Sequence, residues 1–241
     1  MLSAKFSQWL AILWQMWANS NVIILCFNAY SCGKFLSNIL SYNKNFIPQY
    51  PFGTGQQPIQ AKDIDYNQMS FDELLSARHT VVMQSLPPRD DVTNWVYYEL
   101  GCEQFWGTHA DSISKIPISA KAEWAMNQGK YCCIMAHNPD QAKVLTEHFP
   151  FAIVVKIVND CKINLLSKKI KTNKPAWYID FLKTYRPAGC LEFDINSLFD
   201  QDLFFKNIDQ LLLDIGVEDR SLDPRVTQYY QTYCKFYSDL V

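Results

Sequence analysis

The sequence lacks an excess of charge of either sign. Its 241 residues include 22 Lys and Arg against 24 Asp and Glu, a formal net charge of -2, and charged residues make up only 19%. Proteins that bind the nucleic-acid backbone without sequence preference carry a clear excess of basic side chains. The balance argues against bulk nucleic-acid binding and leaves room for a local basic pocket.

The chain also lacks an apolar run long enough to cross a membrane. Its most apolar N-terminal segment, residues 6–17, is interrupted by Gln8 and Gln15 and is shorter than the ~20 residues of a span. No small-residue cleavage site follows it. Its apolar residues recur at helical spacing, which predicts an amphipathic helix within residues 1–20. We expect this helix to pack on the domain; a partner or a membrane surface is the alternative.

Cysteine motifs and glycosylation sites are missing as well. No Cys-x-x-Cys pair has partners at zinc spacing, and no Asn-x-Ser/Thr acceptor occurs. Free cysteine in an apolar strand behaves as a small hydrophobe. We therefore predict a reducing, cytoplasmic location without a metal site. Five of the eight cysteines lie in or beside apolar runs: Cys26, Cys132, Cys133, Cys161 and Cys190.

What the chain does have is apolar residues in a strand-and-helix alternation. Hydrophobic residues make up 49%, enough for one core, and there are no repeats, so residues 1–241 are expected to form one domain. Continuously apolar runs separated by helical patterns predict a three-layer α/β fold with a mostly parallel sheet of about five strands. The predicted strands are 22–27, 79–84, 131–136, 151–158 and 190–193.

The C-terminal part of the chain is predicted to be helical. One stripe ends at Gly216, and a second helix begins after Asp223 and Pro224. Its tyrosines are expected in the core; a sugar platform is the alternative. Residues 43–68 and 85–128 are predicted as loop and helix excursions over the site. Earlier helices are predicted over 33–40, 93–105, 121–127, 140–148 and 160–171. The inward residues are Leu203, Ile208, Leu211, Leu212 and Ile215, then Val226, Tyr229, Tyr230, Tyr233 and Tyr237.

The turn after the first strand, residues 28–34, has the composition of an anion site. Ligands of open α/β sheets bind at the carboxyl ends of the strands. Gly33 lets the backbone approach a ligand, the N–H groups at a helix start attract an anion, and Lys34 adds a positive charge. An ordinary strand-to-helix turn with a surface lysine is the alternative.

The turn departs from the nucleotide-binding pattern G-x-x-x-x-G-K-[ST] at two positions. Asn28 replaces the first glycine, and Phe35 replaces the Ser or Thr whose hydroxyl binds magnesium. These changes argue against metal-dependent hydrolysis of ATP or GTP. They are compatible with a phosphate bound without metal.

The turn N-A-Y-S-C-G-K-F-L and the segment M-A-H-N-P at 135–139 resemble the P-loop sulfotransferases. Members of that family use 3′-phosphoadenosine 5′-phosphosulfate and need no magnesium. The resemblance implies that His137 is the base for the acceptor hydroxyl and that Lys34 acts on the transferred group. It also implies that the 5′-phosphosulfate is bound by Tyr30, Ser31, Cys32, Gly33, Lys34 and Phe35.

A third matching segment follows the strand at 151–158. In the sulfotransferase family, the corresponding strand ends in an arginine, and a serine follows eight residues later. Both residues bind the 3′-phosphate of the co-substrate. Here Ser167 fits that spacing and Asn159 stands at the arginine position. The family's early loop lysine is replaced by Ala29 and Tyr30. Three lysines nearby in the sequence are candidates for the missing charge: Lys162, Lys168 and Lys169.

Other candidate residues have simpler explanations beside the functional ones. A structural hydrogen bond is the alternative for His137, and a loop salt bridge is the alternative for Arg89 as an anion clamp. Glu99 and Glu103 lie four residues apart on one predicted helix face, where a solvated surface is favoured. A phosphatase nucleophile at Cys32 is excluded because the required arginine position holds Asn38. No role is assigned to His79, His109 or His148.

Three functions are therefore compared. The first is transfer of a sulfuryl group from 3′-phosphoadenosine 5′-phosphosulfate to a hydroxyl of a carbohydrate or small molecule. The second is a non-catalytic protein of the same fold that binds a partner. The third is a metal-using nucleotide kinase or hydrolase, against which Phe35 argues.

Overall fold

The computed structural model describes most of the predicted α/β elements but not all of the candidate loops. The described residues are 21–27, 32–46, 70, 72–73, 75–76, 79, 129–136, 139–158 and 189–240. The predicted helices at 1–20, 93–105, 121–127 and 160–171 lie outside them. So do the excursion at 85–128 and most of the one at 43–68.

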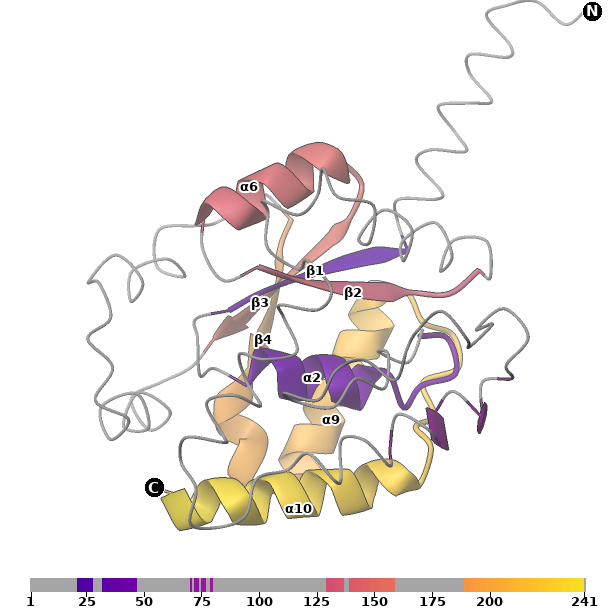
Figure 1. Ribbon diagram of the computed structural model, residues 1–241, viewed down its shortest axis with the longest axis vertical. Helices are drawn as coiled ribbons and strands as arrows, with labels where there is room; N and C mark the ends of the chain where they lie inside the picture. Colours follow the sequence, from indigo (N-terminus) through magenta and orange to yellow (C-terminus); the bar gives the residue numbers. More distant parts are fainter. Residues whose placement is uncertain are drawn as a thin grey trace, which may run out of the picture.

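The described part of the chain contains four strands that form one all-parallel sheet (Figure 1). Their order in the sheet is β2-β1-β3-β4. The α/β class and the parallel sheet are thus confirmed. The predicted fifth strand at 79–84 begins at a residue that is helical, His79, and its remainder lies outside the described residues. The four strands are β1 (Val22–Cys26), β2 (Cys132–Ala136), β3 (Ile153–Val158) and β4 (Leu191–Asp194).

Helices cover both faces of this sheet (Figure 1). Helix α6 (Pro139–His148) lies on one face, and α2 (Gly33–Leu40) and α9 (Gln201–Ile215) lie on the other. Helix α10 (Arg225–Leu240) packs on the outer side of α2 and α9, and the 3₁₀ helix η3 (Ile195–Phe199) joins β4 to α9. The predicted three layers are therefore present, with α10 added outside one of them.

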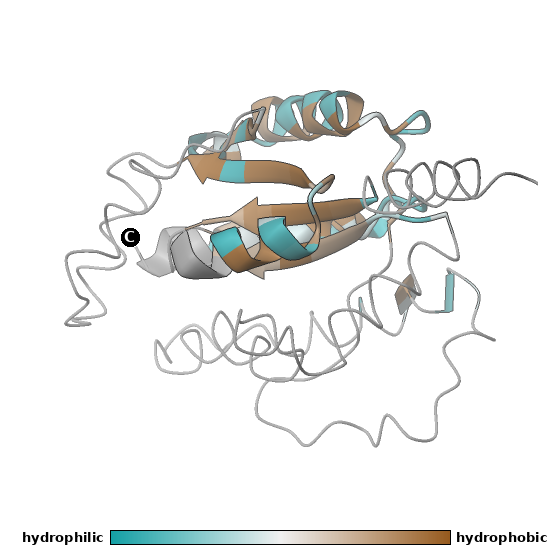
Figure 2. Ribbon diagram, turned by 90° about the horizontal axis from the view of Figure 1, so that it is seen from above, coloured by the Kyte–Doolittle hydropathy of each residue, from teal (hydrophilic) through white to brown (hydrophobic). Residues whose placement is uncertain are grey.

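The two faces of β1 enter separate cores because successive strand side chains point in opposite directions. Ile23 and Leu25 pack with α2, α9 and α10, whereas Val22, Ile24 and Cys26 pack toward α6. Strands β1, β2 and β3 are predominantly hydrophobic along their length, and brown dominates the strands in Figure 2. A strand with two buried faces explains why the sequence is continuously apolar there.

Helix α9 confirms the predicted end at Gly216 and corrects one inward residue. Its first turn is capped by the Asp200 carboxylate, which accepts from the Leu203 N–H at 3.0 Å, and it ends at Gly216 with φ 92°. Leu203 was predicted to face inward and is 45% exposed, whereas Phe204 is fully buried. The reason is the helical period: Phe204 lies four residues before Ile208, and Leu203 is rotated away from that stripe.

Three of the four inward tyrosines predicted in α10 belong to the core. Tyr229, Tyr230 and Tyr233 are at most 4% exposed. The Tyr230 hydroxyl donates to the Leu198 carbonyl at 2.6 Å, so its polar end is satisfied inside the protein. These rings present no open platform for a sugar. The side chain of Tyr237 lies outside the described residues.

The described cysteines are free thiols, and those in strands are buried. Cys132 and Cys133 both lie in β2 and are buried, which confirms the strand interpretation of this vicinal pair. Burial raises the pKa of the Cys26 thiol to about 12. Cys161 lies outside the described residues. None of the helices in the described part of the chain is both long and apolar enough to cross a membrane.

Candidate functional site

The carboxyl ends of three neighbouring strands meet at one edge of the sheet. Cys26 at the end of β1 pairs with Ala136, the last residue of β2, and with Lys156, two residues before the end of β3. The pairing continues one step further, because the Phe27 N–H donates to the Ala136 carbonyl at 3.1 Å. The three predicted site segments follow these strands in the chain. They therefore begin at the same edge.

This edge is also the point where the strand order reverses. From β1 the chain reaches β2 on one side, and from β2 it crosses to β3 on the other side of β1. The helix after β1 and the helix after β2 lie on opposite faces. Such a reversal opens the crevice in which α/β sheets bind ligands. The topology thus offers a ligand position beside the end of β1.

Several predicted site residues themselves lie outside the described residues. His137 directly follows β2 and Asn159 directly follows β3, so only their starting points in the fold are defined. The same holds for Tyr30 and Ser31, and Ser167 lies further along the chain. The backbone of Lys34 lies in the first turn of α2. Among the remaining candidates, Arg89, Glu99, Glu103, His109, Lys162, Lys168 and Lys169 are also outside the described residues.

The start of α2 is an unusual turn. Its N-cap residue, Cys32, has φ 57° and ψ 23°, and it is the one non-glycine residue with positive φ in the described part of the chain. This left-handed conformation costs an L-residue roughly 1–2 kcal/mol. The Cys32 side chain does not cap the helix, and the first turn carries no acidic residue. The positive end of the helix dipole therefore has no carboxylate or hydroxyl supplied by these positions.

Gly33 is required by packing, whatever binds nearby. A Cβ at Gly33 would overlap the ring of Phe27, which is 1% exposed. The ring at the end of β1 therefore fits directly against the backbone where α2 begins. From the sequence, Gly33 was expected to let the backbone come close to an anion. Its packing against Phe27 is a second, independent reason for a glycine at this position.

Phe35 belongs to the core of the domain. Its side chain is fully buried and stacks on Tyr233 with ring centroids 4.0 Å apart. The buried side chain of Phe35 cannot contact a cofactor. Only the backbone of Phe35 could make the predicted contact. The Tyr233 hydroxyl in turn donates to the Cys32 sulfur at 3.4 Å. The turn is therefore contacted by two aromatic side chains: the Phe27 ring packs against Gly33, and Tyr233 of α10 donates to Cys32.

Lys156 is a charged residue at this edge to which the sequence analysis gave no role. Its position two residues after Val154 places it on the α6 face of β3, and it is 6% exposed. Its Nζ lies 3.5 Å from Oε1 of Glu192, a side chain that is 59% exposed. A buried ammonium with one distant, solvated partner is costly. The sequence feature that could have drawn attention to Lys156 is that it is the single charged residue of the otherwise apolar predicted strand 151–158.

The two described histidines lie away from this edge. His148 is exposed at the end of α6. His79 Nδ1 and the Tyr42 hydroxyl are 2.7 Å apart, and Tyr42 follows the C-terminal end of α2. Burial lowers the pKa of His79. Neither residue is brought to the candidate site.

Comparison with known proteins found no matching family model, no similar curated protein and no similar solved structure. Within the described ranges, no three His, Cys, Asp or Glu side chains gather in a way that could hold a metal ion. Support for a function therefore comes from the chain's own residues and from the topology that brings their segments together.

Proposed function

We propose that the protein is a sulfotransferase-like enzyme that uses 3′-phosphoadenosine 5′-phosphosulfate as its co-substrate. The observation that carries this proposal is the meeting of the ends of β1, β2 and β3 at the edge where α2 begins. The three segments that resemble the family follow these three strands. A ligand at this edge would be within reach of all three.

In the proposed reaction the acceptor hydroxyl attacks the sulfur in line with the leaving phosphate. His137 takes the hydroxyl proton, the new O–S bond forms, and the bond from sulfur to the 5′-phosphate oxygen breaks. Lys34 and the N–H groups at the start of α2 stabilise the charge that grows on the leaving phosphate. Ser167 and Asn159 are assigned to the 3′-phosphate. The sulfuryl group is already activated, so no metal is assigned.

A second candidate function is binding of a partner without catalysis. Asn159 in place of arginine and Ala29–Tyr30 in place of an early lysine favour it, because both changes remove positive charge. The packing of Gly33 on Phe27 also accounts for the glycine without any ligand. This alternative predicts a stable protein that releases no heat with nucleotide and forms a stoichiometric protein complex.

Calorimetry with 3′-phosphoadenosine 5′-phosphate separates the two. We expect the wild-type chain to bind it and Lys34→Ala to lose at least tenfold in affinity, as for one charged contact to a phosphate. Lys206→Ala is the matched control, because Lys206 is an exposed lysine of α9 and its loss changes the net charge equally. Absence of binding by the wild type would overturn the proposal. Magnesium-dependent ATP turnover would favour the kinase or hydrolase instead.

The base assignment needs a separate experiment. Transfer of labelled sulfate from the nucleotide to a panel of phenols and monosaccharides would be compared for wild type and His137→Ala. We expect turnover to fall by ~10²–10⁴-fold, the usual contribution of a general base. Nucleotide affinity should stay unchanged. Full turnover by His137→Ala would show that another group takes the proton.

A further inference from the structure

We infer that Tyr233 is a positioning residue for the anion-binding turn: its hydroxyl holds Cys32 in the left-handed conformation from which α2 starts. This inference rests on the proposed function for its nucleotide-binding consequence. Its structural part, the control of the turn by α10, is independent of any ligand.

Tyr233 reaches the turn from the far end of the chain. The two residues are 201 positions apart, and both side chains are fully buried. The Tyr233 hydroxyl donates to the Cys32 sulfur at 3.4 Å, within the range of a hydrogen bond to sulfur. The same ring stacks on Phe35, three residues further along α2. Tyr233 therefore contacts the turn on both sides of Gly33.

The conformation of Cys32 needs such support. A left-handed non-glycine residue is strained and persists where its surroundings over-determine it. Cys32 also sets the direction in which the first N–H groups of α2 point, because its carbonyl accepts from the Leu36 N–H at 2.9 Å. If the turn relaxed, these donors would leave the direction of the phosphate. A turn fixed before the ligand arrives saves the entropy of ordering it on binding.

Tyr229 provides a matched control within the same helix. It lies one turn before Tyr233, is equally buried, and also packs on Phe35, with ring centroids 5.4 Å apart. Its hydroxyl accepts a hydrogen bond from Asn38 Nδ2 at 2.9 Å. Asn38 lies in the second turn of α2, away from the turn that starts the helix. Tyr229→Phe thus removes a comparable buried hydrogen bond without touching Cys32.

The experiment compares Tyr233→Phe and Tyr229→Phe in the full chain. Each variant is titrated with 3′-phosphoadenosine 5′-phosphate, and backbone amide exchange is followed by mass spectrometry for peptides that cover residues 32–36. We expect Tyr233→Phe to weaken nucleotide binding roughly fivefold, the value of one neutral hydrogen bond. Exchange at the start of α2 should accelerate by a similar factor. Tyr229→Phe should leave both within twofold, although both variants lower the melting temperature slightly.

The outcomes separate the two claims. Equal effects of both variants on affinity and exchange would overturn the positioning role, because a general loss of packing would explain them. Unchanged exchange at residues 32–36 in Tyr233→Phe would overturn it as well. If exchange is faster in Tyr233→Phe and not in Tyr229→Phe, and the wild-type protein binds no nucleotide, the control of the turn stands and the proposed function is overturned.

Discussion

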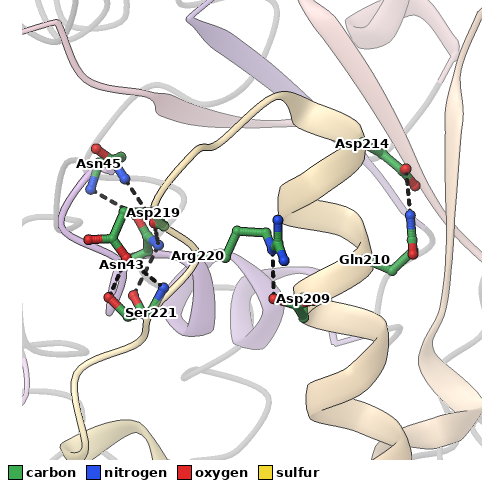
Figure 3. A network of polar contacts seen from close by, with 8 residues as sticks. All are labelled: Asn43, Asn45, Asp209, Gln210, Asp214, Asp219, Arg220 and Ser221. Carbon is green, nitrogen blue, oxygen red and sulfur yellow. Dashed lines mark hydrogen bonds and ion pairs between the residues drawn. The ribbon is translucent and has the colours of Figure 1, made fainter.

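The two ends of α2 are held in different ways. The segment directly after the C-terminal end, residues 41–46, makes a network of polar contacts with the loop that follows α9 (Figure 3). The N-terminal end is held by the Phe27 ring and by the Tyr233 hydroxyl, and its N-cap side chain does not cap it. One end is closed by paired polar groups, and the other presents helix N–H groups at the edge where ligands of this fold class bind.

Asn43 is the centre of the closed end. It is fully buried, and its Nδ2 donates to the carbonyls of Asp219 at 2.8 Å and Ser221 at 3.0 Å. Its Oδ1 accepts from the Asn45 N–H at 2.8 Å. Three polar groups of the surrounding backbone thus find partners in one side chain. Such anchoring keeps α2 fixed, which a site at its other end needs in order to hold its geometry.

The largest effect is expected at the N-terminal end, from Gly33→Ala. The new Cβ would overlap the buried Phe27 ring, and overpacking of this kind costs about 3 kcal/mol in free energy of unfolding. Urea denaturation measures it. The double variant Phe27→Leu with Gly33→Ala should recover part of the loss relative to the sum of the two single changes. Additive effects would show that the ring and the glycine do not interact.

Gly216→Ala is the comparison at another helix end. Nothing lies within 4 Å of a Cβ built there, but the residue has φ 92°. We expect a smaller loss, about 1 kcal/mol, because only the backbone conformation is unfavourable for alanine. A loss at Gly33 no larger than at Gly216 would contradict the close fit between β1 and α2.

The next effect in size is expected at the closed end, from Asn43→Ala. The Ser221 carbonyl and the Asn45 N–H would lose their hydrogen bonds to Asn43, and the Asp219 carbonyl would keep only the bond from Asn45, which costs about 2 kcal/mol. Asn45→Ala is the control, because its half-buried side chain donates a single hydrogen bond, to the Asp219 carbonyl at 3.0 Å. Urea denaturation should rank Asn43→Ala well below Asn45→Ala in stability. Nucleotide affinity should change in neither variant, and a loss of affinity would show that the two ends of α2 are coupled.

The difference between the two ends also shows what the sequence can predict. The strand 22–27 and the helix 33–40 followed from local apolar patterns, and the structure confirms both within a residue. The Cys32–Tyr233 and Asn43–Asp219 contacts join residues far apart in the chain, so no local pattern could indicate them. The sequence has apolar residues at both 203 and 204, so the apolar pattern alone does not decide which faces inward, and packing buries Phe204.

At the candidate site the sequence predicted the parallel strands β1, β2 and β3 that the site segments follow, but not the packing around the start of α2. The glycine before Lys34 was recognised as a nucleotide-loop feature, whereas its contact with Phe27 depends on how β1 packs on α2. Lys156 was visible as the lone charge of its strand, but its burial depends on the two strands beside it. Motif patterns thus indicate candidate residues, and tertiary packing decides which of their side chains can take part.

A smaller effect is expected from acid at the closed end. Hydrogen bonds from Lys44 and Ser221 hold the pKa of the Asp219 carboxyl well below its usual range. The folded pKa is therefore lower than the unfolded value of ~3.9, so this stabilisation is present above about pH 5 and is lost as pH falls further. Asp219→Asn should reduce the change in melting temperature between pH 6 and pH 3. An identical pH profile for Asp219→Asn and wild type would show that the contact contributes no stability.

The smallest change in stability is expected from Lys156→Met, near the sheet edge where the carboxyl ends of β1, β2 and β3 meet. Glu192 is solvated and tolerates the loss of its partner, and methionine fills the buried position, so unfolding should change by less than about 1 kcal/mol. Glu192→Gln should cost more, because it leaves the buried ammonium without its carboxylate. If Lys156 only pairs with Glu192, nucleotide affinity stays constant in both variants. A weaker nucleotide affinity for Lys156→Met at unchanged stability would place this ammonium in the candidate site, where it could compensate for the asparagine at position 159.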